Sequence, residues 1–331
     1  MLVRPHFQRL VERARMRPAV RAGFVFPTDR EWLQLALSAA FAGFFTPVLI
    51  GPEARIRDAA AHAGLDISPI PIANTSDSTH AAVACALELA RAGAVRVLVR
   101  GSLANEDLLG PIVASGSGLR TGQRLSHAHF LDLSGRAQGL LLADAMLNIA
   151  PTLGAKKDIV HNTIELAIGL GIAQPHVAVL AASALVNPAL PSTLDASALK
   201  TMGAQGLFGD AIVDGPLPMD AALSADVARA QGLGAEVAGH ADILVVPAME
   251  PGALLVRAMT VLTGGLAAGL VLGAQLPIVL PSRIDAMEVR MASCVLAALH
   301  ANRAEDAAHR RGTGRLASAA SPVIMGQPAA S

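Results

Sequence analysis

Two adjacent residues, Ser282 and Arg283, place a hydroxyl beside a guanidinium directly after a long uncharged apolar run. The run covers residues 258–281, and a helix-like stretch follows over residues 284–300. A hydroxyl, the donors of a guanidinium and the first amides of a helix can together hold the oxygens of a phosphate. The pair therefore points to chemistry on a phosphate or an acyl phosphate. A serine helix cap beside a solvated arginine explains the same two residues equally well.

The elements that must position this pair follow an alternating pattern of short apolar runs and amphipathic, Ala/Leu-rich stretches. The alternation is typical of an α/β protein with mainly parallel strands. We predict strands over residues 22–26, 47–50, 95–99, 129–133, 140–142, 176–180, 211–213, 243–246 and 277–280. We predict helices over residues 30–42, 79–92, 156–170, 197–205, 221–231 and 287–301.

Polar residues stand at the ends of several predicted strands. They are Arg100, Ser102, Asp144, Asn187, Asp214 and the Ser282-Arg283 pair. Ligands of open α/β sheets bind at the carboxyl ends of the strands. We therefore expect these residues to gather at one site.

Length and composition limit the classes of protein that the chain can be. A chain of 331 residues corresponds to about two domains. Hydrophobic residues make up 53% of it and aromatic residues only 3%, so Ala, Val, Leu and Ile must fill the core. Lys plus Arg equals Asp plus Glu at 26 each, which leaves no overall field to attract nucleic acid or an acidic membrane surface.

Three features concern the cellular location. Residues 1–20 are rich in Arg and lack a sustained apolar segment, which argues against a secretory signal. The apolar run 258–281 contains four glycines and Pro277 and lacks a Trp or Tyr belt, which favours a soluble segment over a membrane span. Cys85 and Cys294 lie in Ala-rich helical contexts typical of unpaired buried thiols. We expect a cytoplasmic protein whose residues 303–331 form a flexible C-terminal tail after a short helical start.

Several familiar catalytic motifs are absent from the sequence. It has no G-x-x-x-x-G-K-[ST] loop, no G-x-G-x-x-G after the first strand, no H-E-x-x-H and no G-x-S-x-G. His127 and His129 would face one side of a strand, but no carboxylate or cysteine stands nearby at ligand spacing. We interpret them as structural histidines and expect no metal site.

A series of segments, taken in order, resembles the phosphate acetyl/butyryltransferase family. The collinear match runs from about residue 24 to residue 300. It includes residues 100–109 (RGSLANEDLL), 118–121 (GLRT), 124–127 (RLSH), 143–148 (ADAMLN), 157–160 (KDIV), 186–188 (VNP), 191–195 (PSTLD), 214–217 (DGPL), 237–239 (VAG), 241–244 (ADIL) and 282–283 (SR). The segments VNP, SRID and ASC, the last at residues 292–294, are similar to the phosphate butyryltransferase-like branch. The extra N-terminal hydratase-like domain of some relatives is not expected here.

The resemblance implies two three-layer α/β/α domains with mainly parallel sheets and an interdomain cleft. This architecture is similar to that of the isocitrate and isopropylmalate dehydrogenases, and the proteins are usually homodimers. Domain I would comprise residues 1–148 and 282–302, and domain II residues 149–281. An NAD-dependent dehydrogenase on the same architecture is disfavoured, because the motifs do not assemble the metal-binding carboxylates that such an enzyme needs.

The resemblance also implies a reaction: acyl-CoA and inorganic phosphate give acyl phosphate and CoA, reversibly, with an acyl group from acetyl to butyryl. CoA is a substrate, and no cofactor, metal or covalent enzyme intermediate is expected. Arg283 would neutralise phosphate and Ser282 would donate to the carbonyl oxyanion. The remaining candidates for substrate binding are Arg100, Ser102, Asp144, Asn148, Asn187 and Asp214. Arg120 and Arg124 would extend the anion-binding surface or else be solvated loop arginines.

The chain departs from the family pattern at several positions. Arg100 replaces a lysine, and alanines stand at positions 248 and 253, where the family has Asp and Asn. Val289 stands where the acetyltransferases carry an acidic residue, the proposed thiol base. Asp285 is our preferred replacement base, although a favourable charge in the first turn of a helix explains it about as well. The alternative function is a degenerate relative that binds CoA or an acyl phosphate and acts as a regulatory or binding subunit.

Overall fold

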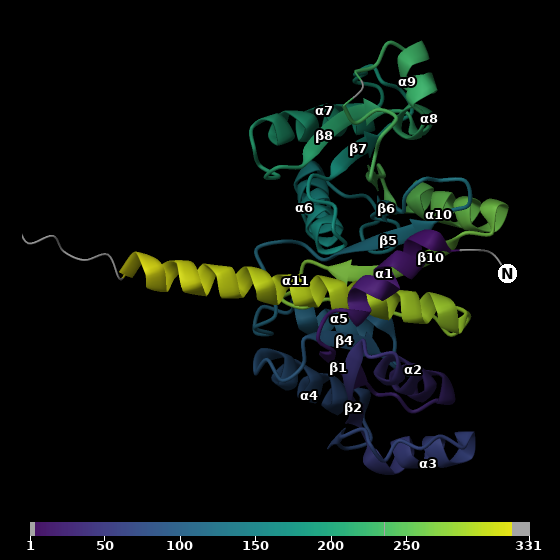
Figure 1. Cartoon of the computed structure of the whole chain (residues 1–331), viewed down its shortest axis with the longest axis vertical. Helices are drawn as coiled ribbons and strands as arrows, with labels where there is room; N and C mark the ends of the chain where they lie inside the picture. Colours follow the sequence, from purple (N-terminus) through teal and green to yellow (C-terminus); the bar gives the residue numbers. More distant parts are fainter. Residues whose placement is uncertain (1–3, 235, 320–331) are drawn as a thin grey trace, which may run out of the picture.

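A computed structural model describes residues 4–234 and 236–319, and their strands form one sheet (Figure 1). The strand order is β3-β2-β1-β4-β11-β10-β5-β6-β9-β7-β8. The strands are β1 (Val20–Val25), β2 (Phe45–Gly51), β3 (Ile72–Asn74), β4 (Val97–Arg100), β5 (Ser126–Asp132), β6 (Leu140–Ala143), β7 (His176–Leu180), β8 (Ile212–Leu217), β9 (Ile243–Val245), β10 (Leu266–Leu272) and β11 (Ile278–Val279). Seven of the strand pairings are parallel and three are antiparallel. The predicted mixed α/β class with a mainly parallel sheet is confirmed.

Helices connect the strands. They are α1 (Pro5–Arg15), α2 (Arg30–Phe41), α3 (Glu53–Ala63), α4 (Thr79–Arg91), α5 (Asn105–Val113), α6 (Leu153–Gly169), α7 (Pro191–Ala204), α8 (Met219–Leu223), α9 (Ala225–Ala230), α10 (Met249–Thr263) and α11 (Met287–Ala319). Figure 1 shows α11 crossing the middle of the molecule, where it contacts α1, α2, α6 and β10. It continues past residue 302, where the sequence predicts a flexible tail, and residues 320–331 of that tail lie outside the described residues.

All nine predicted strands and five of the six predicted helices are confirmed. The sixth prediction, one helix over residues 221–231, is wrong. Ser224 ends α8 in an extended conformation, and its hydroxyl then caps α9 by accepting the Val227 N–H at 3.4 Å. Six further elements of the structure were not predicted from the sequence: the helices α1, α3, α5 and α10 and the strands β3 and β10.

The apolar run 258–281 is the most informative of these omissions. It contains the end of α10, all of β10 and all of β11. Gly264 adopts the left-handed conformation, with φ +63°, and ends α10 there, since glycine enters that region without strain. Within the described residues, no helix is both long and apolar enough to cross a membrane.

The antiparallel pairings reverse the direction of half the sheet. β10 runs antiparallel to both β11 and β5, and β5 runs antiparallel to β6. Three successive reversals leave β6, β9, β7 and β8 pointing opposite to β4 and β11. The carboxyl ends of β4 and β11 therefore lie on one side of the sheet, where strands of one group end, and the carboxyl ends of β6, β9, β7 and β8 lie on the opposite side. The prediction that the polar strand ends gather at one place is wrong for this reason.

The core is built from small and medium-sized aliphatic side chains, as the low aromatic content of the sequence predicts. Its three clusters of buried residues consist mostly of Ala, Val, Leu and Ile, with Trp32, Phe24 and Phe45 as the largest fully buried side chains. Cys85 and Cys294 are free, as predicted, and burial raises the pKa of both thiols. In Cys294 the rise keeps the buried thiol in its unreactive protonated form.

Buried histidines predict a pH dependence of stability. Burial lowers the pKa of His127 and of His300 to about 4, below the ordinary value of 6.5. The unfolded chain therefore takes up protons that the folded chain does not, and stability is lost as pH falls from about 6.5 towards 4. We expect a loss of up to about 1.4 kcal/mol per pH unit for each histidine.

Thermal unfolding between pH 7 and pH 4.5 measures this effect. The variant His300→Leu should flatten the dependence, while His62→Asn, at an exposed histidine beside Asp58, should leave it unchanged. A melting temperature that stays constant across this range would contradict the prediction.

Candidate active site

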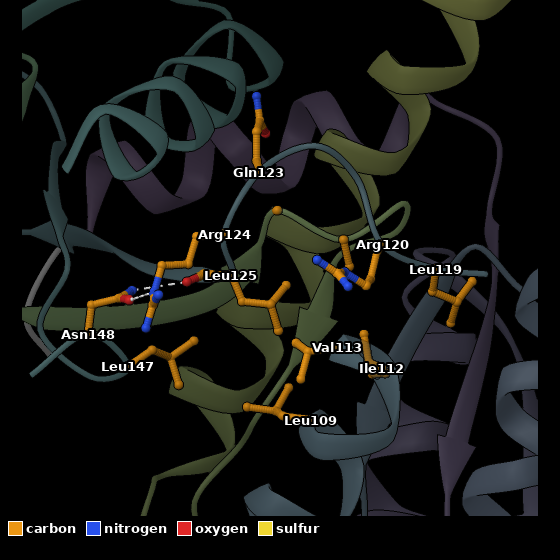
Figure 2. A pocket seen from close by; sticks show the side chains of 12 residues that line it. Leu109, Ile112, Val113, Leu119, Arg120, Gln123, Arg124, Leu125, Leu147 and Asn148 are labelled. Atoms are coloured by element: carbon orange, nitrogen blue, oxygen red, sulfur yellow. Dashed lines mark hydrogen bonds between the residues drawn. The ribbon is translucent and has the colours of Figure 1, made fainter. Parts of the chain in front are cut away.

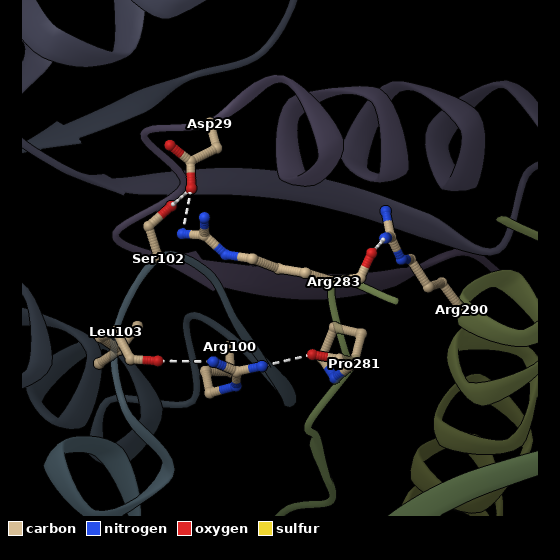
Figure 3. A network of polar contacts seen from close by, with 7 residues as sticks. All are labelled: Asp29, Arg100, Ser102, Leu103, Pro281, Arg283 and Arg290. Atoms are coloured by element: carbon tan, nitrogen blue, oxygen red, sulfur yellow. Dashed lines mark hydrogen bonds and ion pairs between the residues drawn. The ribbon is translucent and has the colours of Figure 1, made fainter. Parts of the chain in front are cut away.

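The end of β11 carries Ser282 and Arg283 to the end of β4. The two strands are parallel neighbours, with Ile278 opposite Leu98 and Val279 opposite Val99. Ser282 and Arg283 follow in the turn between β11 and α11. Figure 3 shows Arg283 near Ser102 and Asp29. Of the predicted site residues, Arg100, Ser102, Ser282, Arg283 and Asp285 belong to this group of adjoining strand ends, which we call the β4/β11 site.

Arg100 joins the two strand ends. Its guanidinium donates to the carbonyl oxygens of Leu103 (2.6 Å) and of Pro281, the residue before Ser282. Burial lowers the pKa of Arg100, and the nearby charge of Arg283 lowers it further. Two nitrogens of Arg100 thus hold backbone carbonyl groups on either side of the site.

Gly101 explains how the chain passes beside β1. A Cβ atom at this position would lie 2.4 Å from the carbonyl oxygen of Val25 and 2.6 Å from that of Phe26. These distances exclude any side chain, because both contacts are with backbone. The amides of Gly101 and Ser102 donate to the same two carbonyls, which fixes the position of the Ser102 hydroxyl.

Asp29 is a part of the site that the sequence analysis missed. Its Oδ2 accepts a hydrogen bond from Ser102 Oγ at 2.9 Å and forms an ion pair with Arg283 Nη2 (Figure 3). The side chain of Arg283 is 63% exposed and that of Asp29 is 34% exposed. Asp29 and Arg283 are 254 positions apart, so no local pattern could have linked them.

Arg290 is the second missed residue. Its Nε donates to the Ser282 carbonyl at 3.0 Å and its Nη2 to the Arg283 carbonyl at 2.7 Å. The Arg290 side chain is buried, and its Cζ lies 5.1 Å from the centre of the Trp32 ring, while Arg100 Cζ lies 5.7 Å from it. Two guanidiniums on one indole hold the turn by cation–π attraction. The sequence does contain a signal for Arg290, because an arginine on the apolar face of a predicted helix indicates a buried contact.

Asp285 contacts the backbone of the same turn. Its Oδ2 accepts the Ser282 N–H at 2.9 Å. The Ser282 hydroxyl accepts the Ile284 N–H at 3.4 Å, and none of the described residues accepts the hydroxyl proton. The Ser282 O–H is therefore available as a donor to a ligand. Val289, at the position where the acetyltransferases carry an acidic residue, packs against the core and supplies no base.

Asp144 and Asn148 lie at the other edge of the sheet. Both are buried, and the Asp144 carboxylate accepts the backbone N–H groups of His127, Met146 and Leu147 at 2.8–3.1 Å and the Asn148 amide at 2.6 Å. These donors satisfy the carboxylate, so Asp144 shapes the turn after β6. The side-chain oxygen Oδ1 of Asn148 accepts a hydrogen bond from Arg124 Nε at 2.5 Å.

Asn148 and Arg124 also line a pocket of about 370 Å³ (Figure 2). Polar groups and apolar side chains share its wall. The lining residues are Leu109, Ile112, Val113, Leu119, Arg120, Gln123, Arg124, Leu125, Leu147, Asn148, Gly273 and Ala274. Arg120 and Arg124 thus line this pocket and do not stand among the residues of the β4/β11 site.

Asn187 and Asp214 belong neither to the β4/β11 site nor to the cluster of Asp144 and Asn148. Asn187 is exposed before α7, where its Oδ1 accepts the Ala189 N–H at 2.9 Å. Asp214, on β8, pairs with Lys200 Nζ at 2.7 Å and caps its neighbour Gly215. Their local contacts account for both side chains. Within the described residues no group of three or more His, Cys, Asp or Glu could hold a metal ion, and His127 and His129 contact each other edge to face.

One departure from the family pattern has a structural counterpart. Ala248 occupies the N-cap of α10, where no side chain caps the helix. An aspartate at an N-cap accepts the first free amides of the helix, which an alanine cannot do. Ala248 therefore leaves the first amides of α10 without a side-chain cap.

Comparison with known proteins is consistent with this geometry. The model of the phosphate acetyl/butaryl transferase family matches residues 78–298. A phosphate acetyltransferase of Rhizobium meliloti is 43% identical over 90% of this chain and 94% of its own. A phosphate butyryltransferase of Clostridium acetobutylicum is 32% identical over 88% of this chain and 97% of its own. Of these two, the acetyltransferase is the more similar, so identity does not favour the butyryltransferase-like branch.

Solved structures agree with the sequence relatives. A branched-chain phosphotransacylase from Enterococcus faecalis superposes with a TM-score of 0.74 at 26% identity, covering 85% of this chain and 99% of the other. The family model covers about two thirds of the sequence and includes Arg100, Ser102, Ser282 and Arg283. The chain belongs to the phosphate acetyl/butaryl transferase family.

Proposed function

We propose that this protein is a phosphate acyltransferase that moves a short-chain acyl group reversibly between CoA and inorganic phosphate. The observation that carries the proposal is the β4/β11 site, where the Arg283 guanidinium and the Ser102 hydroxyl meet on Asp29 and Arg100 holds the carbonyl of Pro281, directly before Ser282. Family membership supports the same reaction, because relatives bear the names phosphate acetyltransferase and phosphate butyryltransferase. The names of these relatives support a transferred acyl group between acetyl and butyryl in size.

The reaction needs positive charge and an oxyanion donor. A phosphate oxygen attacks the thioester carbonyl, the C–O bond forms, the C–S bond breaks, and the thiolate leaves and takes up a proton. In reverse, the CoA thiol loses its proton and attacks the acyl phosphate. Arg283 neutralises the phosphate, Arg100 adds its charge, and Ser282 donates to the oxygen that becomes negative in the transition state. This chemistry uses side chains alone, and we propose no metal or cofactor.

The domain arrangement is part of the proposal. We assign residues 1–148 and 282–302 to the first domain and residues 149–281 to the second, with the reaction in a cleft between them. Helix α11 contacts α1 and α2 of the first domain and also α6 and β10 of the second, so it packs against both. We further propose a cytoplasmic homodimer, as the family resemblance implies.

A degenerate, binding-only relative is the second candidate. The observation that favours it is the loss of polar groups at Ala248 and Ala253. Phosphate-dependent release of CoA thiol from acetyl-, propionyl- and butyryl-CoA by the purified protein separates the two functions. Thiol release that needs phosphate supports the acyltransferase and ranks its substrates. No release, together with a CoA-dependent rise in melting temperature, would support the binding relative.

The role of Asp285 leads to a separate prediction. Its contact with the Ser282 N–H supports a role in positioning the turn rather than in removing the thiol proton. Asp285→Asn keeps an acceptor for that N–H, so we expect kcat to stay within about threefold and the pH dependence of kcat to be unchanged. Loss of the acidic limb of the pH-rate profile in this variant would instead identify Asp285 as the thiol base.

A further inference from the structure

Asp29 occupies a helix position that its side chain does not use. It is the N-cap residue of α2, with φ −125° and ψ 154°, yet its carboxylate caps no amide of the helix. Aspartate at an N-cap ordinarily accepts the N–H of the second or third helical residue, which stabilises the helix. Here the carboxylate points to Ser102 and Arg283 instead, so the contact with these two residues replaces the cap.

The two groups that Asp29 contacts are the donors that a phosphate would use. A single oxygen, Oδ2, accepts from both the Ser102 hydroxyl and the Arg283 guanidinium. Carboxylate and phosphate oxygens bind the same donors with similar geometry. The Asp29 carboxylate therefore lies where one phosphate oxygen would lie, and its negative charge repels a phosphate that approaches Arg283.

We propose that Asp29 is an internal competitor for the phosphate subsite: it occupies Arg283 and Ser102 in the free protein and is displaced when phosphate or acyl phosphate binds. The inference rests on the proposed function for the identity of the anion. Asp29 would thus lower the affinity of the protein for phosphate, because Arg283 and Ser102 must be released from it before phosphate binds.

The displaced carboxylate has another place to bind. The second and third residues of α2 are Glu31 and Trp32, and the N–H groups of the first helical turn lack a side-chain cap. A rotation of the Asp29 side chain would let it cap these amides in the ordinary way. The Asp29 side chain would thus have two positions. Without phosphate it contacts Arg283, and with phosphate bound it caps the start of α2.

This exchange predicts a direction of effect that a supporting role for Asp29 does not. Because Asp29→Asn removes the competing charge while Asn remains a good N-cap residue, phosphate should bind more tightly. The substitution removes the ion pair with Arg283 and the repulsion of the incoming phosphate, so we expect a three- to tenfold decrease of the KM for phosphate (about 0.7 to 1.4 kcal/mol). If Asp29 only oriented Arg283, the same substitution would raise KM.

The test is calorimetric titration of inorganic phosphate into the wild type and into Asp29→Asn and Asp29→Ala, together with KM and kcat from thiol release. Both variants should bind phosphate more tightly, and kcat should change less than KM does. The control is Asp226→Asn, which removes an equally charged partner from the exposed Asp226–Arg229 pair (2.9 Å) and should change neither quantity. Unchanged or weaker phosphate binding in both Asp29 variants overturns the inference.

A second measurement reports the movement itself. Phosphate should shift the backbone amide resonance of Trp32 in the wild type and leave it nearly unmoved in Asp29→Ala, which has no carboxylate to place there. A wild type that binds phosphate without any such shift would overturn the exchange. Failure of the proposed function looks different: the wild type would release no thiol, whatever the two Asp29 variants do to phosphate affinity in the calorimeter.

Discussion

Arg283→Ala is expected to lower kcat/KM for phosphate by about a hundredfold, mainly through KM. Arg283 is the exposed guanidinium of the β4/β11 site, and its side chain reaches a carboxylate that can be exchanged for substrate. Hydrogen bonds to a charged partner contribute about 1.5–3 kcal/mol, which corresponds to roughly 10- to 150-fold in affinity. Arg100 cannot replace Arg283, because its nitrogens hold the carbonyls of Leu103 and Pro281.

Initial rates of thiol release over a range of phosphate concentrations measure this loss. Arg283→Lys should restore part of the activity, since lysine supplies the charge but not the forked donor. Arg229→Ala, at an exposed arginine that pairs with Asp226 on α9, is the matched control and should retain wild-type kinetics. A KM for phosphate that Arg283→Ala leaves within twofold of the wild type would exclude Arg283 from the phosphate subsite.

Ser282→Ala is expected to lower kcat by about a hundredfold while changing the KM values much less. The Ser282 backbone is held independently of its hydroxyl, by Asp285 at the N–H and by Arg290 at the carbonyl. The substitution should therefore leave the turn in place and remove one donor to the developing oxyanion, a loss that typically costs about 3 kcal/mol in the transition state.

The effect of Ser282→Ala appears in kcat at saturating acyl-CoA and phosphate. Ser282→Thr keeps a hydroxyl and should retain more activity than the alanine variant. Ser68→Ala, which changes an exposed serine remote in sequence, serves as the control. A proportional rise of KM without a fall in kcat would mean that the hydroxyl binds substrate and transition state equally.

Much of the fold was predictable because its signals are local. The strands around Val97–Arg100 and Ile278–Val279 are short apolar runs, and the helix from Met287 is a stretch rich in Ala and Leu. The strand β10 was not predictable, because residues 258–281 are apolar throughout and show no periodicity that separates a helix end from two strands. Strand β10 runs antiparallel to both of its neighbours, and the antiparallel pairing of β5 with β6 then reverses the strands beyond it. The predicted site was too large because these strand directions were not predicted.

Some residues of the β4/β11 site could be predicted from the sequence and others could not. Ser282, Arg283 and Arg100 could be found because each stands where an apolar run ends, and a collinear set of segments supports them. Asp29 and Arg290 could not, because their partners are chosen by packing: Asp29 meets a residue 254 positions away, and Arg290 reaches back from inside a helix. The sequence by itself determined the class of fold, the family and the serine–arginine pair, since these depend on residue type and order. The tertiary structure alone decided which strand ends meet and which carboxylate holds Arg283, because strand direction and long-range contacts are set by how the whole chain packs.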